Sequence, residues 1–468
     1  MKIHRHLPVT AKTSQSRKAA LSSTRRILTG SIAAACALAF LGGTAAQAVT
    51  YYWDTNSTTL GFGTTAGTWG TSLFWGTVVG GTGATANTTI LATDDVNFGT
   101  VTDGLTGAAA GVAVTGAVNV HNITFGSASS AVTLSGGTSI TLGGATPTIT
   151  VNNTLDTISS IIAGAAGLVK SGTGTLVLSG INTYTGATTV SQGTLTLSGA
   201  RTVATGGTYT VGSLGNSATL NISLGTHTLA TSGFIVGTSA TGGVTGTVNQ
   251  TGGTVTFTPN GNNGMLIGNG AATGIYNLSA GTLSSSGTVS TTRGIMLGVN
   301  DNANATFNLS GTGILTNAGG ILMVGRSDTA LTGGTTNTVA YNQTGGTATT
   351  ASLTIGGKAA GTNTINATFS VTGGSFSATL FPTLSPGNNN TSTLTIGSTA
   401  TVTLPAIPTA RGTSSSASIT FDSSAGGYLR PTATSATYMP AGTFSTAKLT
   451  ANGARFDTNT FDITIGQV

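Results

Sequence analysis

Short apolar runs that each end in glycine recur along residues 234–400. Their glycines are separated by 31, 30, 27, 31 and 41 residues. A run of aliphatic and β-branched residues that stops at a turn residue is typical of a strand, so each copy predicts a short strand followed by a turn. The copies are Ile235-Val236-Gly237, Leu266-Ile267-Gly268, Met296-Leu297-Gly298, Met323-Val324-Gly325, Thr354-Ile355-Gly356 and Thr395-Ile396-Gly397.

A second strand pattern alternates with the first and ends near a Gly-rich pair. Two interleaved strand signals that share a period of about 30 residues predict one coil of a β-solenoid, because a single coil cannot bury its inner face and stacked coils can. We therefore expect an all-β chain that folds as a right-handed parallel β-helix. The copies of this pattern are 248–254, 276–282, 307–313, 341–347 and 369–375, with Asn249, Asn277, Asn308, Asn342 and Ser370 aligned.

The alternation inside these strands predicts which side chains point inward. In Thr254-Val255-Thr256-Phe257-Thr258 every second residue is apolar, as expected for a strand with one buried face. We expect Asn249, Asn277, Asn308 and Asn342 to stack in register, with their amides hydrogen-bonded along the solenoid axis. The alternative is that these four residues lie in surface turns.

Composition supports strands and argues against helices. The 468 residues include 72 Gly and 9 Pro, only 6% are charged, and all ten acidic residues are Asp. Without Glu and with little Lys, the chain lacks the residues that stabilise exposed helices, which excludes helical bundles and doubly wound α/β enzymes. A hydrophobic content of 38% also excludes the low-hydrophobicity, high-charge composition of disordered chains.

The positive net charge of +6 belongs to the start of the chain. Seven of the 16 basic residues precede position 27, so no basic face is expected on the folded part and we predict no nucleic-acid partner. The basic stretch, the apolar run 27–41 and the small residues Ala46 and Ala48 are typical of a signal peptide over residues 1–48 with cleavage after Ala48. Arg25-Arg26 leaves twin-arginine export open, and Cys36 leaves lipoprotein acylation open. Once the signal is removed, the chain has no Cys and hence no disulfide.

Residues 167–199 contain a more specific unit. It has a Leu168-x-Lys170-x-Gly172-x-Gly174-Thr-Leu opening, an Asn-Thr-Tyr-Thr-Gly centre at 182–186 and a Gly-Thr-Leu close at 193–195. This unit resembles the autotransporter-associated β-strand repeat, also called the passenger-associated transport repeat. The resemblance implies a β-helical passenger of a large exported bacterial protein, with the secretion machinery as a partner. Lys170, Gly172, Gly174, Asn182, Tyr184, Gly186 and Gly193 are its motif residues here.

The pattern inside this unit predicts a role for each kind of residue. We expect the glycines to make turns, Lys170 to be a solvated cation at a strand end and Tyr184 to cover a turn. We expect the aliphatic residues to face the interior of a coil; they are Leu168, Leu176, Leu178, Val190, Leu195 and Leu197.

The rest of the chain divides by composition. We predict an N-terminal β region at 49–166 that caps the solenoid, the repeat at 167–199, solenoid coils at 200–400 and an incomplete C-terminal β segment at 401–468. The three Trp residues, Trp53, Trp69 and Trp75, all fall in the first of these. They can either close an exposed solenoid end or form a platform on which sugar rings stack.

Candidates for chemistry are few. Glycoside hydrolysis needs two facing carboxylates, and only Asp301 and Asp328, with Arg326 nearby, are spaced so as to meet on neighbouring coils. The oxygen-rich stretch 301–304 could bind Ca²⁺ but carries only one charge. His121 and His227 stand outside any ligand pattern, and we expect no cofactor and no metal.

Together these features predict an exported, non-enzymatic β-solenoid, located at the cell surface or outer membrane or secreted, that acts as a structural or adhesin-like protein. Host or environmental glycans or matrix are the expected partners, and the oligomeric state stays open. The alternative is a glycan-binding or glycan-degrading β-helix protein, such as a polysaccharide lyase or hydrolase.

Overall fold

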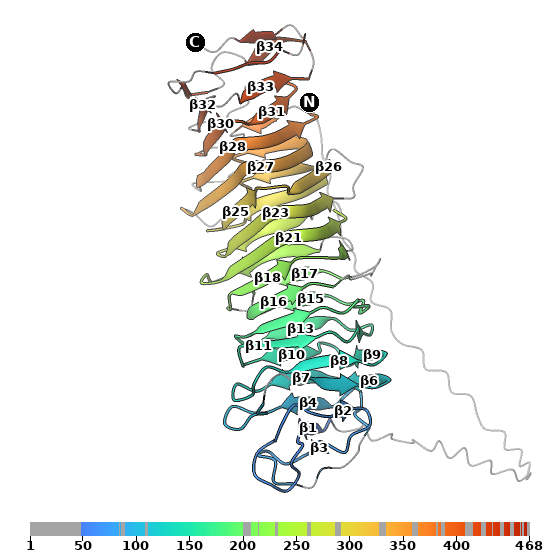
Figure 1. Cartoon of the computed structure of the whole chain (residues 1–468). Helices are drawn as coiled ribbons and strands as arrows, with labels where there is room; N and C mark the ends of the chain where they lie inside the picture. The colour runs from blue at the N-terminus through green and yellow to red at the C-terminus, as the bar shows by residue number, and fades with distance from the viewer. Residues whose placement is uncertain are drawn as a thin grey trace, which may run out of the picture. The chain divides into compact units, whose positions relative to one another are not determined.

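The computed structural model describes residues 48–465, except for gaps at 84, 86–88, 108–110, 200–206, 214, 230–232, 260–263, 286–291, 327–333, 358–363, 381, 385–388, 408–414, 423–426, 433, 440–443, 450–453, 459 and 461–462. Every regular element in these residues is a β-strand. The unit that begins at Gln47 is a stack of coils, which Figure 1 shows from its blue to its red end. Arg25-Arg26, Cys36 and Ala46, which carry the predictions about export and cleavage, lie outside the described residues, and Ala48 is exposed.

The first coils begin at β1, whose two edges are both paired. β1 runs parallel to β4 and antiparallel to β3, where Trp53 lies opposite Trp75. A short third sheet, β6-β9-β12, adds a face to these coils. The strands are β1 (Thr50–Trp53), β2 (Thr68–Trp69), β3 (Trp75–Gly76), β4 (Asp95–Phe98), β5 (Val112–Val114), β6 (Ala117–Val120), β7 (Asn122–Phe125), β8 (Thr133–Gly136), β9 (Ser139–Leu142), β10 (Thr148–Val151), β11 (Leu155–Ile158) and β12 (Ile162–Ala163).

The middle coils contain the repeat unit. Here the strands are three to five residues long. They are β13 (Leu168–Ser171), β14 (Thr175–Leu178), β15 (Thr188–Val190), β16 (Gly193–Leu197), β17 (Tyr209–Val211), β18 (Ala218–Ile222) and β19 (Thr226–Leu229).

In the later coils some strands are longer and continue around a corner, so that one strand contributes to two faces. β21 pairs with both β18 and β19 of the preceding coil, and its pairing with β23 shifts register near Thr251. The strands of these coils are β20 (Phe234–Ser239), β21 (Thr245–Phe257), β22 (Met265–Gly270), β23 (Thr273–Ser285), β24 (Thr292–Val299), β25 (Asn304–Leu309), β26 (Ile314–Val324), β27 (Thr336–Ile355), β28 (Thr364–Ala378), β29 (Thr383–Leu384), β30 (Thr391–Gly397) and β31 (Thr401–Leu404). The last strands are β32 (Ser416–Asp422), β33 (Tyr428–Pro431), β34 (Ser435–Met439), β35 (Thr446–Leu449) and β36 (Ile463–Ile465).

Parallel ladders connect each coil to the next. One ladder passes through β14, β16, β18, β21, β23, β25, β27, β28, β30, β32 and β35 without interruption. A second passes through β19, β21, β23, β26, β27, β28, β31 and β33. The predicted all-β parallel solenoid is therefore confirmed.

Alternation sets the interior, as the sequence pattern predicts. The burial of β14 and β16 alternates along the strand, and the aliphatic residues predicted to face the coil interior in the repeat unit are all buried. Because each coil stacks on the next, these side chains form one continuous hydrophobic core from Trp53 to Phe444.

The predicted asparagine ladder is confirmed and is longer than expected. Each amide donates from Nδ2 to Oδ1 of the preceding coil: Asn277 to Asn249 at 2.8 Å, Asn308 to Asn277 at 2.8 Å and Asn342 to Asn308 at 3.0 Å. Asn249 donates in the same way to Asn221. Asn221 was not predicted as part of the ladder because its surrounding residues do not match the copies of the second strand pattern. The amide of each coil therefore fixes the register of the next.

An aromatic stack runs inside the same face. The Tyr276 and Phe307 rings lie 5.3 Å apart and 2° from parallel, Phe307 and Tyr341 are 5.6 Å apart, and Tyr341 and Phe369 are 4.8 Å apart. All four side chains are fully buried. Ring stacking at the coil spacing is possible because parallel in-register pairing places identical positions directly above one another.

Two buried glutamines satisfy the hydroxyl groups of this stack. Tyr276 donates to Gln250 Oε1 at 2.6 Å, and Gln250 Nε2 donates to the Gly253 and Thr282 carbonyls. Gln343 does the same for Tyr341 in a later coil. The Asn-Gln-Thr-Gly-Gly motif thus places its Asn outward in the ladder and its Gln inward as a link to the glycine corner.

Candidate functional site

The lysine of the repeat unit is buried. We expected Lys170 to be a solvated cation at a strand end, and this is wrong: its side chain is 0% exposed and points from β13 into the coil. Its Nζ donates to the carbonyl oxygens of Ser171 at 2.8 Å, Gly172 at 2.9 Å and Gln192 at 3.1 Å. These three bonds use all three N–H groups of the ammonium. Since Gln192 belongs to the next coil, the lysine joins two successive coils at one corner.

The glycines of the Lys-x-Gly-x-Gly run make this corner possible. Gly172 has a φ of 76°, which a residue with a Cβ adopts only at a cost. A Cβ on Gly174 would collide with the carbonyl oxygen of Asn153 in the preceding coil. The chain can therefore curl around the ammonium while staying in contact with the coil below.

The central and closing motif residues of the repeat unit pack against neighbouring coils. Asn182 is buried and its Oδ1 accepts a hydrogen bond from the Ile162 amide at 2.9 Å. Tyr184 is buried, and its hydroxyl lies 2.7 Å from Thr188 Oγ1. A Cβ on Gly186 would collide with the Gly167 backbone, and Gly193 has a φ of 68°. These residues hold adjacent coils in contact, and the Tyr184 ring belongs to the core.

A buried carboxylate shares this region with the lysine. Asp156 on β11 is 1% exposed, and its Oδ1 accepts hydrogen bonds from the Val132 amide at 2.7 Å and from Asn153 Nδ2 at 3.0 Å. Burial raises the pKa of Asp156 to about 6, although these two bonds and the charge of Lys170 act against the rise. Burial lowers the pKa of Lys170 to about 8, and the negative charge of Asp156 opposes that change.

The two shifted pKa values predict a minimum of stability near neutral pH. Between pH about 4 and about 6 the folded state keeps the Asp156 proton that the unfolded chain has lost, so stability falls as the pH rises. Between pH about 8 and about 10.5 the unfolded chain holds the Lys170 proton that the folded state has lost, so stability rises with pH. Each change is worth about 3 kcal/mol at most. Guanidinium unfolding at a series of pH values measures both limbs.

Matched variants separate these two groups from all others. Asp156→Asn can still accept both hydrogen bonds and should remove the acidic limb, whereas Lys170→Met should remove the alkaline limb. Because each charge opposes the pKa shift of the other group, the remaining limb should widen in each variant: Lys170 should lose its proton at a lower pH in Asp156→Asn, and Asp156 should lose its proton at a higher pH in Lys170→Met. Identical pH profiles for the wild-type chain and both variants would contradict the assignment.

The tryptophan cluster is internal. Trp53, Trp69 and Trp75 are 0%, 1% and 3% exposed, and Trp75 makes edge contacts with the other two at 5.0 and 5.4 Å. A sugar platform needs an exposed ring face, so the structure contradicts the glycan-platform alternative for these residues. The rings belong instead to the core of the first coils, where they pack against Phe98 in tilted and edge-on contacts.

The candidate residues of the glycan-degrading alternative do not form a facing pair among the described residues. Arg326 is 2% exposed and its Nη1 contacts Met296 Sδ, so a substrate cannot reach it. Asp301 is half-buried at a corner, and Asp328 lies outside the described residues. His227 is buried with its ring beside Tyr209, and His121 contacts Asp95 at 3.2 Å. Within the described ranges no group of three or more His, Cys, Asp or Glu could hold a metal.

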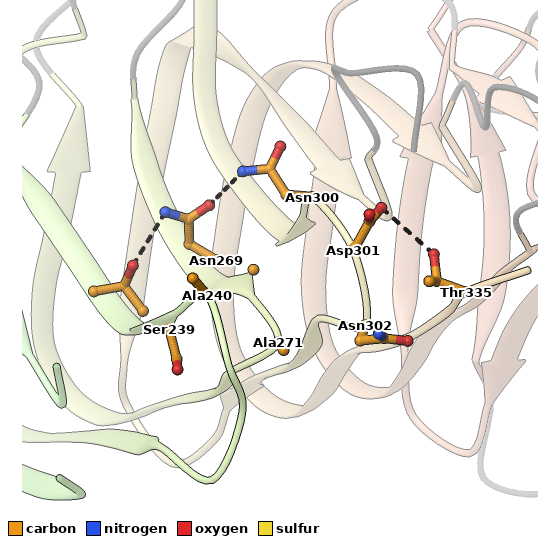
Figure 2. A pocket seen from close by; sticks show the side chains of 10 residues that line it. Ser239, Ala240, Asn269, Ala271, Asn300, Asp301, Asn302 and Thr335 are labelled. Atoms are coloured by element: carbon orange, nitrogen blue, oxygen red, sulfur yellow. Dashed lines mark hydrogen bonds between the residues drawn. The ribbon is translucent and has the colours of Figure 1, made fainter. Parts of the chain in front are cut away.

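A polar groove that the sequence pattern did not predict lies at the corner that contains Asp301. It has a volume of about 540 Å³ and spans four coils. Along one side Asn300 Nδ2 donates to Asn269 Oδ1 at 2.8 Å, and Asn269 donates to Thr238 at 3.3 Å, as Figure 2 shows. On the other side the Thr335 hydroxyl donates to Asp301 at 3.4 Å.

The sequence signal for this groove was present but weak. Thr238, Asn269 and Asn300 each follow the glycine of an apolar run by one or two residues. Asn300 and Asn302 have φ values of 67° and 57°, a left-handed conformation that Asn tolerates better than most residues. The one-residue difference in spacing hid the alignment, which only the stacked coils reveal.

Comparison with known proteins identifies the repeat unit. Residues 168–197 match the passenger-associated-transport-repeat family. The match spans β13 to β16 and includes the buried lysine, both glycines of its corner, Asn182 and Tyr184. The unit described above is therefore a passenger-associated transport repeat.

A relative among well-characterised proteins is an adhesin. The chain is 40% identical over 155 residues to the "Adhesin BmaC autotransporter" of Brucella suis biovar 1 (strain 1330). The match covers 32% of this chain and 4% of that relative. No solved structure matches the chain. The protein is thus an autotransporter passenger-like β-solenoid related to an adhesin.

Among the described residues, no helix has the length and apolar character required to cross a bilayer.

Proposed function

We propose that this protein is an exported, non-enzymatic β-solenoid passenger that acts at the cell surface or in the medium as a structural or adhesin-like protein. The observation that carries the proposal is a transport repeat built into an uninterrupted parallel solenoid, together with the similarity to an autotransporter adhesin. The secretion machinery is its partner during export.

The surface chemistry supports this role. The outward positions of successive coils carry hydroxyl and amide groups, such as Thr228, Thr256, Ser284, Thr316 and Thr349 on one face. Parallel stacking repeats these groups at the spacing between strands, about 4.8 Å. Such a surface suits many weak contacts along an extended partner, which gain strength through multivalency.

Fractionation of the native cells tests the proposal. We expect the protein in the outer membrane or the medium, cleaved by added protease in intact cells, with weaker attachment of a deletion strain to coated surfaces. Full protection from protease in intact cells together with recovery in the cytoplasmic fraction would overturn it.

A further inference from the structure

We infer that the polar groove at Asn269, Asn300 and Asp301 binds a linear, uncharged oligosaccharide that lies along the solenoid axis. This inference rests on the proposed function, because it names what an exposed passenger would contact. The proposed sugar-binding site is thus the groove and not the tryptophan residues, which are buried.

The first support is the shape of the groove. A second hollow of about 540 Å³, lined in part by Ser213, Gly215 and Thr241, shares Thr238, Ser239 and Ala240 with the first. The two hollows therefore adjoin at these three residues, and their described lining residues come from successive coils. A ligand lying across both would meet a hydroxyl or amide group on each of these coils.

The second support is the chemistry of the lining. Asn300 is the last member of the Thr238-Asn269-Asn300 line, and its Oδ1 receives no hydrogen bond from the described part of the chain. The Asn302 side chain is exposed at the same edge, as Figure 2 shows. Amide groups that can both donate and accept suit the hydroxyls of a sugar, and a carboxylate such as Asp301 accepts hydrogen bonds from them.

The third support is what the lining lacks. None of the described residues that line the groove is Lys, Arg or His, so these residues offer no counter-charge to a phosphate or an acidic polymer. Its apolar groups are small, chiefly the Ala240 and Ala271 methyls, whereas sites for apolar ligands are lined mostly by hydrophobic and aromatic side chains. One carboxylate is also too little charge for a Ca²⁺ site, which ordinarily has several. A neutral polyhydroxylated ligand fits what remains.

The experiment uses the purified full chain on an immobilised array of uncharged oligosaccharides: β-glucans, mannans, xylans and N-acetylglucosamine oligomers. Calorimetry with the best binder, in Ca²⁺ and in EDTA, then gives its Kd. We expect at least one linear oligomer to bind in both buffers, more tightly as its length increases from two to six residues.

Variants assign the binding to the groove. Ala240→Arg places a long side chain into the groove from an exposed position and should abolish binding. Asp301→Asn keeps the shape and should weaken binding about tenfold, the value of one hydrogen bond to a charged acceptor. Thr312→Arg, exposed at the turn between β25 and β26, is the matched control and should bind as wild type.

Three results would overturn the inference: no oligosaccharide binds, the Ala240→Arg variant binds as tightly as wild type, or calorimetry detects binding of Ca²⁺ but not of an oligosaccharide. The proposed function is tested independently of this inference. If the protein is exposed at the cell surface but binds no oligosaccharide, ligand binding at the groove is refuted and the passenger role stands. If the protein is cytoplasmic but binds an oligosaccharide through the groove, the passenger role is refuted and the inferred ligand binding stands.

Discussion

Replacing Lys170 with Ala is expected to lower the free energy of unfolding of the repeat unit by about 3 to 5 kcal/mol, the usual cost of removing one partner from a buried charged network. The change removes three hydrogen bonds at once and leaves the Ser171, Gly172 and Gln192 carbonyls without their donor. It also removes the positive charge that lowers the pKa of the buried Asp156. Guanidinium unfolding with hydrogen exchange over residues 168–197 measures both the size and the place of the loss.

Two further variants separate packing from charge. Lys170→Met keeps most of the apolar stem and should lose less stability than Lys170→Ala, because it leaves a smaller cavity. Adding Asp156→Asn to Lys170→Met should restore part of the loss, since the uncompensated buried carboxylate is then gone. If Lys170→Ala unfolds like the wild-type chain, or if the double variant is the least stable of all, the ammonium does not hold this corner.

Replacing Phe307 with Ala is expected to cost about 3 to 5 kcal/mol, the range for emptying a large aromatic site in a well-packed core. Phe307 is fully buried and stacks between Tyr276 and Tyr341 at 5.3 and 5.6 Å. Both neighbouring rings therefore lose a partner, and the cavity divides the aromatic stack in two. Because each coil contacts only its neighbours, the loss should be local.

Hydrogen exchange by strand checks this second result. Amides of β23, β25 and β27 should lose protection first, while those of the repeat unit at β13 to β16 keep theirs. Phe307→Leu, which retains much of the volume, is the control and should cost less than about 1.5 kcal/mol. Equal costs for the Ala and Leu variants, or loss of protection along the whole chain, would show that the stack does not act as a local unit.

Much of the fold could be predicted from the pattern of the sequence. Alternating Thr and aliphatic residues, with glycines about 30 residues apart, predicted parallel coils, and Asn249, Asn277, Asn308 and Asn342 form the expected ladder. These predictions succeed because strand alternation and in-register stacking depend on local periodicity. Both are visible in a linear sequence.

The sequence was a poorer guide to polar residues. Lys170 has the sequence context of a surface charge, yet it is buried because carbonyls of two different coils converge on its Nζ. The spacing of Trp53, Trp69 and Trp75 in the sequence left both a cap on the solenoid end and a sugar platform open. The antiparallel pairing of β1 with β3 brings Trp53 and Trp75 together. In each case the deciding contacts come from another part of the chain.

The groove shows the same difference between what the local sequence pattern predicts and what the contacts between coils decide. In the sequence, Thr238, Asn269 and Asn300 each follow the glycine of an apolar run by one or two residues, and no site was predicted from them. Only the stacking of coils decided that their amides and hydroxyl would bond in one line beside Asp301 and Thr335. Periodicity determines which face a residue occupies, because that depends on its own strand. Its neighbours on that face depend on the register between coils, and tertiary pairing sets that register.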